Sequence, residues 1–170
     1  NIMAHHCEKT LKVNVPAEKV WQVLEDYNNI DRFAMTIKSS ASVNEINSGL
    51  GAKRTCTFND GSSLVEEIIE YQEGQGYKMD ISNHSMPLKS MQSEMKVTAI
   101  DENCSEIYMS ADFVVKGGAL GWIMGQLIMG PVMKSIFKKV MTGLAYHSLT
   151  GEIISEKLPA NEKLAQIIHA

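Results

Sequence analysis

Hydrophobic and polar residues alternate in several stretches of the chain, as they do in strands that bury one face. Between Glu8 and Val15, the apolar residues Leu11, Val13 and Val15 alternate with polar ones. Short turn sequences rich in Gly, Asn, Asp or Pro separate six later stretches, which favours consecutive antiparallel hairpins. We therefore predict a seven-stranded antiparallel sheet with one buried face, whose later strands are residues 37–46, 52–58, 63–71, 77–83, 91–100 and 107–115.

Helical periodicity follows the first strand. After Pro16, Val20 and Leu24 recur at helical spacing, and the stretch from Tyr27 to Phe33 suits one or two further turns. We expect these two short helices to form one V-shaped connection to the second strand.

A longer helix is predicted from Pro131 to about Lys157, with Asn161 starting another short turn beyond Pro159. It carries one apolar stripe, which indicates one buried face. The stripe consists of Met133, Ile136, Phe137, Val140, Met141 and Leu144.

The segment 117–131 before this helix is nearly uncharged and has glycines at four-residue spacing, as membrane helix pairs do. The run is about 15 residues, shorter than the roughly 20 that a bilayer needs, and Gln126 and Pro131 interrupt it. We therefore expect no transmembrane span here. The segment is predicted to be either a mobile lid or a buried lead-in to the long helix.

The composition of the 170 residues is typical of one globular domain, with 44% hydrophobic and 21% charged residues. We expect a single domain over 1–170 with its core at about 8–157. The net charge of −4, without a dense Lys/Arg block, argues against a nucleic-acid partner. A homodimer stays open as an alternative to a monomer.

The cysteines and histidines suggest no special chemistry. Cys7, Cys56 and Cys104 are odd in number and widely spaced, which favours reduced thiols and a cytoplasmic setting. The N-terminal residues lack the basic and apolar regions of a signal peptide. His5 and His6 are either metal ligands or the exposed start of a strand, and the second is favoured because no further ligands are visible. We expect no metal and no cofactor.

The order of elements, one strand, two short helices, six strands and a long helix, is that of the α+β helix-grip fold. Gly51-Ala-Lys-Arg54, Asn59-Asp60-Gly61, Glu66, Tyr77 and Met86-Pro87 make the chain similar to the bacterial polyketide cyclase/dehydrase-like branch of the SRPBCC (START-like) superfamily. The resemblance covers residues 8–157. It implies a curved sheet wrapped around the C-terminal helix, with a cavity for a small hydrophobic ligand.

In the related plant abscisic-acid receptors, two loops close over the ligand as a gate and a latch. The corresponding positions here are 59–63 and 83–87. The first departs from the receptor sequence, and only His84 resembles the latch. The resemblance thus implies a shared pocket but not hormone sensing.

Glu66 and Glu67 are neighbours in a strand, so their side chains point to opposite faces and one of them points inward. The resemblance selects Glu66, with Arg54 on the preceding strand as its companion. A buried carboxylate needs such a partner. The pair either orients a polar group of a ligand or is a purely structural salt bridge.

Six of the eleven methionines fall on predicted inward faces, where they either line an adaptable pocket or simply fill the core. His84 is either an acid–base group near the pocket mouth or an exposed loop residue, and His147 is interpreted as a surface or rim residue. The predicted ligand-binding residues are Arg54, Phe58, Glu66, Tyr77, Met79, His84, Met91, Met95, Met109, Phe113, Met133, Phe137 and Met141.

Three functions compete at this stage. The leading hypothesis is binding or transport of a small hydrophobic molecule, such as a lipid, an isoprenoid quinone or a polyketide-like aromatic. The alternative is a polyketide cyclase or aromatase in which Arg54, Glu66 or His84 polarises carbonyls and moves protons. The third is an interaction protein whose glycine-rich lid closes over a ligand and presents a surface to a partner.

Overall fold

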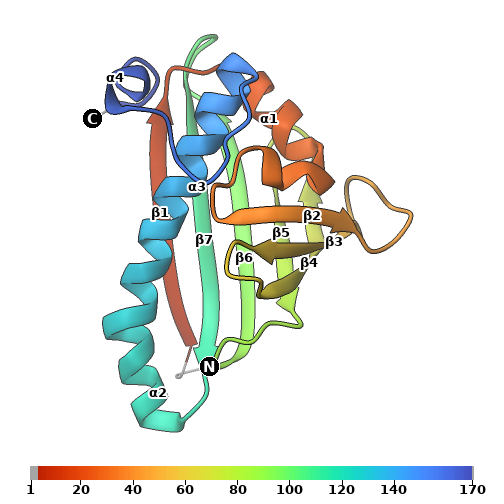
Figure 1. The fold of residues 1–170 in the computed structure, drawn as a ribbon, viewed down its shortest axis with the longest axis vertical. Helices are drawn as coiled ribbons and strands as arrows, with labels where there is room; N and C mark the ends of the chain where they lie inside the picture. Colours follow the sequence, from red (N-terminus) through yellow and green to blue (C-terminus); the bar gives the residue numbers. More distant parts are fainter. Residues whose placement is uncertain (1–3, 170) are drawn as a thin grey trace.

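A computed structural model describes residues 4–169 (Figure 1). A single antiparallel sheet curls around a long helix, with the helical segment 17–32 and the C-terminal segment at one end of the molecule. The strands are β1 Ala4–Val13, β2 Ile37–Ser42, β3 Lys53–Phe58, β4 Ser63–Gln72, β5 Gly76–Ser82, β6 Leu88–Ala99 and β7 Ser105–Val115. The helices are α1 Ala17–Glu25, η1 Tyr27–Arg32, α2 Gly118–Met124, η2 Gly125–Met129, α3 Gly130–Thr150 and α4 Asn161–Leu164.

The sheet has seven strands in the order β1-β7-β6-β5-β4-β3-β2, and every neighbouring pair is antiparallel. Hairpins join consecutive strands from β2 to β7. The connection through α1 and η1 crosses the sheet, so β1 pairs with β7 at one edge and β2 lies at the other edge. This confirms the predicted helix-grip architecture with its two short helices between the first two strands.

The core lies between the concave face of the sheet and α3. Alternate residues of β1 point into it: Leu11, Val13 and the following Val15 are buried, as the alternation predicts. From α3, Met141 and Leu144 are fully buried. Sheet and helix therefore bury their apolar faces against each other, which is the main source of stability in such a two-layer fold.

Two strand ends differ from the prediction by four residues, more than any of the others. β1 begins at Ala4 rather than Glu8, and His5 is buried, which corrects its interpretation as an exposed residue. β2 ends at Ser42 rather than at residue 46, because the Asn44 side chain donates to the Gly51 carbonyl and folds the segment into a loop. Residues 1–3 of the predicted N-terminal segment lie outside the described part.

The long helix starts earlier and ends earlier than predicted. α2, η2 and α3 form one continuous helix over 118–150, joined through a π-helical turn. It ends at Thr150 instead of Lys157 because Gly151 adopts a left-handed conformation with φ +75°. The segment 118–129 is thus a helical lead-in, but much of its surface is exposed rather than buried.

This helix is the one helix of the described residues that is long and apolar enough to cross a membrane, with a mean hydropathy of 1.2. Its second half, however, is the core helix that the sheet surrounds. Beyond it, the chain returns to β1, where Asn14 N–H donates to the Ile167 carbonyl at 2.7 Å and Val13 forms a bridge with Ile168.

Candidate ligand-binding pocket

A cavity of about 160 Å³ lies between the sheet and α3. Strands β3 to β7 and the start of β2 supply one wall, and one face of α3 supplies the other. The lining is almost entirely apolar. It consists of Ile30, Thr36, Ile37, Arg54, Cys56, Phe58, Leu64, Glu66, Met79, Ile81, Met86, Met91, Ser93, Met95, Met109, Met133, Ile136, Phe137 and Val140.

One charged pair interrupts this apolar wall. Arg54 on β3 and Glu66 on β4 are direct partners in the antiparallel register, so both side chains point to the same face. Arg54 Nε and Nη2 lie 2.9 and 2.7 Å from the same carboxylate oxygen, Oε1 of Glu66. The side chains are 3% and 14% exposed, respectively, so the pair is held at the cavity wall rather than in bulk solvent.

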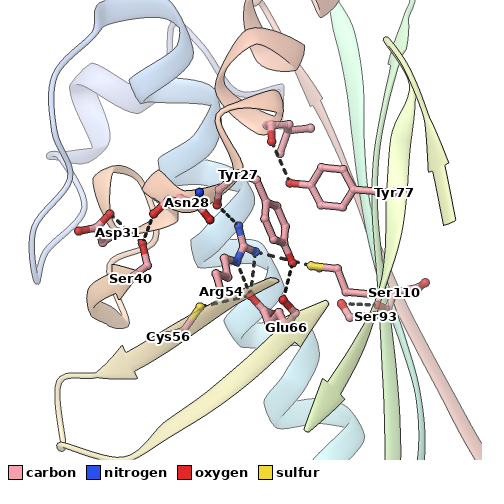
Figure 2. A network of polar contacts seen from close by, with 12 residues as sticks. Tyr27, Asn28, Asp31, Ser40, Arg54, Cys56, Glu66, Tyr77, Ser93 and Ser110 are labelled. Carbon is pink, nitrogen blue, oxygen red and sulfur yellow. Dashed lines mark hydrogen bonds and ion pairs between the residues drawn. The ribbon is translucent and has the colours of Figure 1, made fainter. Parts of the chain in front are cut away.

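The guanidinium of Arg54 is enclosed on its other sides (Figure 2). It stacks over the ring of Tyr27, with 3.7 Å between Cζ and the ring centroid, and Nη1 donates to the Tyr27 carbonyl. Nη2 also lies 3.6 Å from Sδ of Met79. The Tyr27 hydroxyl in turn donates to the backbone carbonyl of Glu66 at 3.0 Å, so η1 locks the pair in place.

The electrostatics of the cluster favour a permanent ion pair. Burial is the largest single influence and opposes the charge of Arg54, but the Glu66 carboxylate together with Tyr27, Cys56 and Tyr77 outweighs it and keeps the pKa of the guanidinium above its ordinary value. Burial, followed by the nearby carboxylate, also raises the pKa of the Cys56 thiol. Cys56 therefore stays protonated and donates to Glu66 Oε1 at 3.3 Å, which makes it a poor nucleophile.

No residue in the described part of the chain uses the second carboxylate oxygen of Glu66. Both contacts from Arg54 and the contact from Cys56 end on Oε1, and Oε2 accepts no hydrogen bond from residues 4–169. Arg54, by contrast, has donors engaged by Glu66, Tyr27 and Met79. The polar atom of this pair that has no hydrogen-bond partner among residues 4–169 is consequently an acceptor, Oε2 of Glu66.

Nine of the thirteen predicted ligand-binding residues line this cavity: Arg54, Phe58, Glu66, Met79, Met91, Met95, Met109, Met133 and Phe137. The other four lie elsewhere. Tyr77 is buried under α1, where its hydroxyl donates to the Leu24 carbonyl and burial raises its pKa to about 12. Phe113 stacks on His5 at a centroid distance of 5.2 Å, and Met141 is inside the core. His84 lies half-buried in the β5–β6 loop, outside the lining.

Sequence reasoning missed several lining residues. Ile37, Leu64 and Ile81 lie on inward faces of predicted strands, so their alternation could have revealed them. Thr36 and Met86 come from turns, where no periodicity indicates a direction. The site could be predicted where strand or helix periodicity operates, and not where loops contribute to it.

The histidines at the N-terminal end of β1 form a separate arrangement. His6 contacts Asp112 at 2.8 Å and Glu8 at 3.0 Å, and these hydrogen bonds raise the pKa of the exposed imidazole. Within residues 4–169, no group of three or more His, Cys, Asp or Glu side chains is placed to hold a metal ion. His147 Nδ1 donates to the Glu152 carbonyl at 2.7 Å, and the residue stays near the surface, outside the cavity lining.

Six methionines line the cavity: Met79, Met86, Met91, Met95, Met109 and Met133. A volume of about 160 Å³ is comparable to an engineered cavity of roughly 150 Å³ that accommodates benzene, whereas drug-sized ligands occupy pockets of about 300–1,000 Å³. Methionine side chains are flexible, so this wall can adapt to ligands larger than one ring.

Larger hollows occur on the outside of the molecule. One of about 450 Å³ runs between α3 and the C-terminal segment, and another of about 520 Å³ lies beside it at the end of α3. Lys138, Lys139 and Lys163 are among their lining residues, and both are open to solvent. The smaller cavity is the better ligand site because it is less open and more apolar than these two hollows and carries one charged pair.

Comparison with known proteins supports the fold and its class. The family model described as polyketide cyclase/dehydrase and lipid transport matches residues 4–148. A search of curated proteins gives no match.

Three solved structures illustrate the similarity of fold. An uncharacterized protein from Bacillus thuringiensis is 20% identical, with a TM-score of 0.69 over 85% of this chain and 99% of that one. Ara h 8.0201 is 23% identical, with a TM-score of 0.62 over 83% and 97% of the two chains. A point mutant of norcoclaurine synthase from Thalictrum flavum, in complex with a transition-state analogue, is 16% identical, with a TM-score of 0.60 over 83% and 94%. At these identities the likeness concerns the fold alone.

Proposed function

This chain belongs to the polyketide cyclase/dehydrase and lipid transport family, and from that premise we propose that it binds or carries a small, largely apolar molecule in the internal cavity. The cavity is the observation that carries the proposal: most of its lining is apolar, and its charged lining residues are a single ion pair. Apolar contact supplies affinity in such a pocket, and a few placed polar groups supply orientation.

The free acceptor of Glu66 narrows the chemistry of the ligand. Among the described residues no donor contacts Oε2, whereas Arg54 already donates to Glu66, Tyr27 and Met79. A hydroxyl group on the ligand would donate to Oε2, and a ligand carboxylate would be repelled by it. We therefore infer a neutral ligand with a hydroxyl or phenol group, such as an isoprenoid or polyketide-like aromatic alcohol.

Binding explains this site better than catalysis does. Of the three groups that the sequence offered for a cyclase, Arg54 and Glu66 are tied to each other and His84 lies outside the cavity lining. Cys56 is protonated and hydrogen-bonded. General acid–base catalysis needs a group that exchanges its proton near neutral pH within reach of the substrate, and neither Arg54 nor Cys56 meets that condition.

A matched pair of probes tests the proposal. We expect 2-naphthol to bind more tightly than 2-naphthoate in isothermal titration calorimetry, because only the naphthol donates to Glu66 Oε2. Thr36→Trp, which fills the edge of the cavity, should abolish binding, and Ser39→Trp on the exposed part of β2 serves as the control. Tighter binding of the naphthoate, or equal binding by Thr36→Trp, would contradict the proposal.

A further inference from the structure

A stripe of large apolar side chains is exposed along the first part of the long helix. Leu120 is 79% exposed and Leu127 is 70% exposed, which is unusual for leucines on a helix of a folded domain. The stripe follows helical spacing over more than four turns. Its members, called the apolar face below, are Leu120, Ile123, Met124, Leu127, Ile128, Val132 and Ile136.

Glycines on the opposite side fix this orientation. A Cβ on Gly121 would lie 2.1 Å from the Lys116 carbonyl oxygen, and one on Gly125 would lie 2.6 Å from His5 Nε2. The small residues therefore occupy the side that packs on the sheet. Trp122 adds to this contact, with its ring 5.3 Å from that of His5. Because the sheet holds the glycine side, the large apolar residues face outward.

All charged side chains between residues 113 and 151 are positive. No acidic residue occurs between 113 and 151, although the whole chain carries a net charge of −4. Lys116 precedes the apolar face, Lys134 lies near its end, and Lys138 and Lys139 follow it; all four lysines are exposed. The acidic residue before this stretch, Asp112, is paired with His6. The helix thus combines an uncharged apolar face with lysines at both ends.

We propose that the apolar face docks onto the surface of an anionic lipid bilayer, with the helix lying in the interface. Helices that bind in this way present apolar and aromatic side chains to the acyl region and lysines to the headgroups. A second copy of the chain fits less well, because pairing two such faces would also bring their lysines together, like charge against like charge. The helix does not span the bilayer, because its second half is the core of the domain.

The docked orientation would set the cavity against the lipid. Ile136 belongs to the apolar face and also lines the cavity, together with Met133 and Phe137 of the same helix. The β5–β6 loop lies at this end too, since Lys116 N–H donates to the Pro87 carbonyl at 2.8 Å. Docking goes beyond the proposed function and does not require a bound ligand.

Vesicle flotation tests the proposal with the full chain. The protein is mixed with vesicles of phosphatidylcholine alone or of phosphatidylcholine with phosphatidylserine, and the vesicle-bound fraction is measured after centrifugation. We expect flotation with the anionic vesicles, and a loss of about tenfold or more in Leu120→Glu/Leu127→Glu, because two apolar contacts are replaced by two like charges. Lys138→Gln/Lys139→Gln should reduce the fraction bound to anionic vesicles by about tenfold and leave the fraction bound to phosphatidylcholine vesicles unchanged.

Val43→Glu/Leu50→Glu is the matched control, because both residues are exposed apolar ones in the β2–β3 loop and the added charge is the same. It should float like the unaltered chain. Three results would overturn the proposal: no flotation with either vesicle, flotation that Leu120→Glu/Leu127→Glu does not change, or a dimer in size-exclusion chromatography that this variant dissociates. Thr36→Trp should still float, so failure of ligand binding and failure of docking can be told apart.

Discussion

The cavity wall buries a charged pair, whereas the first part of the long helix exposes a stripe of large apolar side chains. Both arrangements are costly by themselves. In the wall, the cost is offset within the chain: Arg54 contacts Glu66, the Tyr27 ring and carbonyl, and Met79. On the helix, no described residue covers the apolar face. The charged pair is therefore satisfied by contacts within one molecule, whereas we propose that a lipid surface covers the apolar face.

The same helix shows this difference along its own length. From Met133 to Tyr146, the side chains that face the sheet are buried, while from Leu120 to Ile128 the large side chains point away from it. The π-helical turn η2 lies between the two parts and adds a residue to the helical repeat, which rotates one part relative to the other. A single element thereby serves the core and the surface.

The same leucine-to-alanine substitution in the buried and in the exposed part of the helix should give the largest difference in the free energy of unfolding. Leu144 is fully buried, so Leu144→Ala should lower the free energy of unfolding by about 4 kcal/mol, since it removes apolar contact and leaves a cavity. Leu127→Ala should change it by less than about 0.5 kcal/mol. Urea unfolding of both variants measures this. Equal losses would show that the helical extension belongs to the core.

Removing one charge from the cavity wall should give the next largest effect. Glu66→Gln leaves Arg54 buried without a counter-charge, which should cost about 3 kcal/mol of unfolding free energy. It should also weaken 2-naphthol binding, because Oε2 no longer carries a negative charge. Glu67→Gln, on the opposite face of the same strand, is the control for urea unfolding and calorimetry. A Glu66 variant as stable as Glu67→Gln would mean that the pair contributes little.

The smallest effect concerns the strand end beneath the helical extension. Hydrogen bonds to Glu8 and Asp112 raise the pKa of His6, so the folded chain holds the proton more tightly than the unfolded chain. This stabilisation is fully present below the unfolded pKa and is lost as pH rises through the folded pKa. It should amount to about 0.3 kcal/mol, because His6 is about half exposed.

Urea unfolding at pH 5.5 and pH 8, with His6→Gln as the reference, measures this contribution. The difference in stability between the two chains should be larger at pH 5.5. If it were larger at pH 8 instead, the contacts of His6 with Glu8 and Asp112 would not favour the charged ring.

Periodicity explains what could be predicted. Strand alternation gave the seven strands, their buried faces and most of the lining residues, because a period of two fixes which side chains point inward. The inward direction of Glu66 followed from the doublet and the family resemblance. Tyr77 and Phe113 also point inward, but the sheet curls enough that other elements cover them: α1 covers Tyr77, and His5 stacks on Phe113.

The ends of elements and the helical extension could not be predicted in the same way. The segment 117–131 was expected to be a mobile lid or a buried lead-in to the long helix, because apolar sequence normally indicates burial. The deciding features are the close approach of Gly121 to the backbone at the end of β7 and that of Gly125 to His5 on β1, the second a tertiary contact that no local pattern encodes. Gly151 ended the helix earlier than expected through its left-handed backbone, which the continuing sequence of 152–157 did not reveal.

Native mass spectrometry of the purified full chain, followed by denaturing extraction, tests the central claim most directly. We expect a bound mass of one small, neutral, largely apolar molecule on the unaltered chain and on Leu120→Glu/Leu127→Glu, and no such mass on Thr36→Trp. A chain that retains no mass and binds neither naphthol nor naphthoate would contradict the claim. So would a mass that Thr36→Trp retains in full, because the molecule would then occupy a site other than the cavity between the sheet and α3.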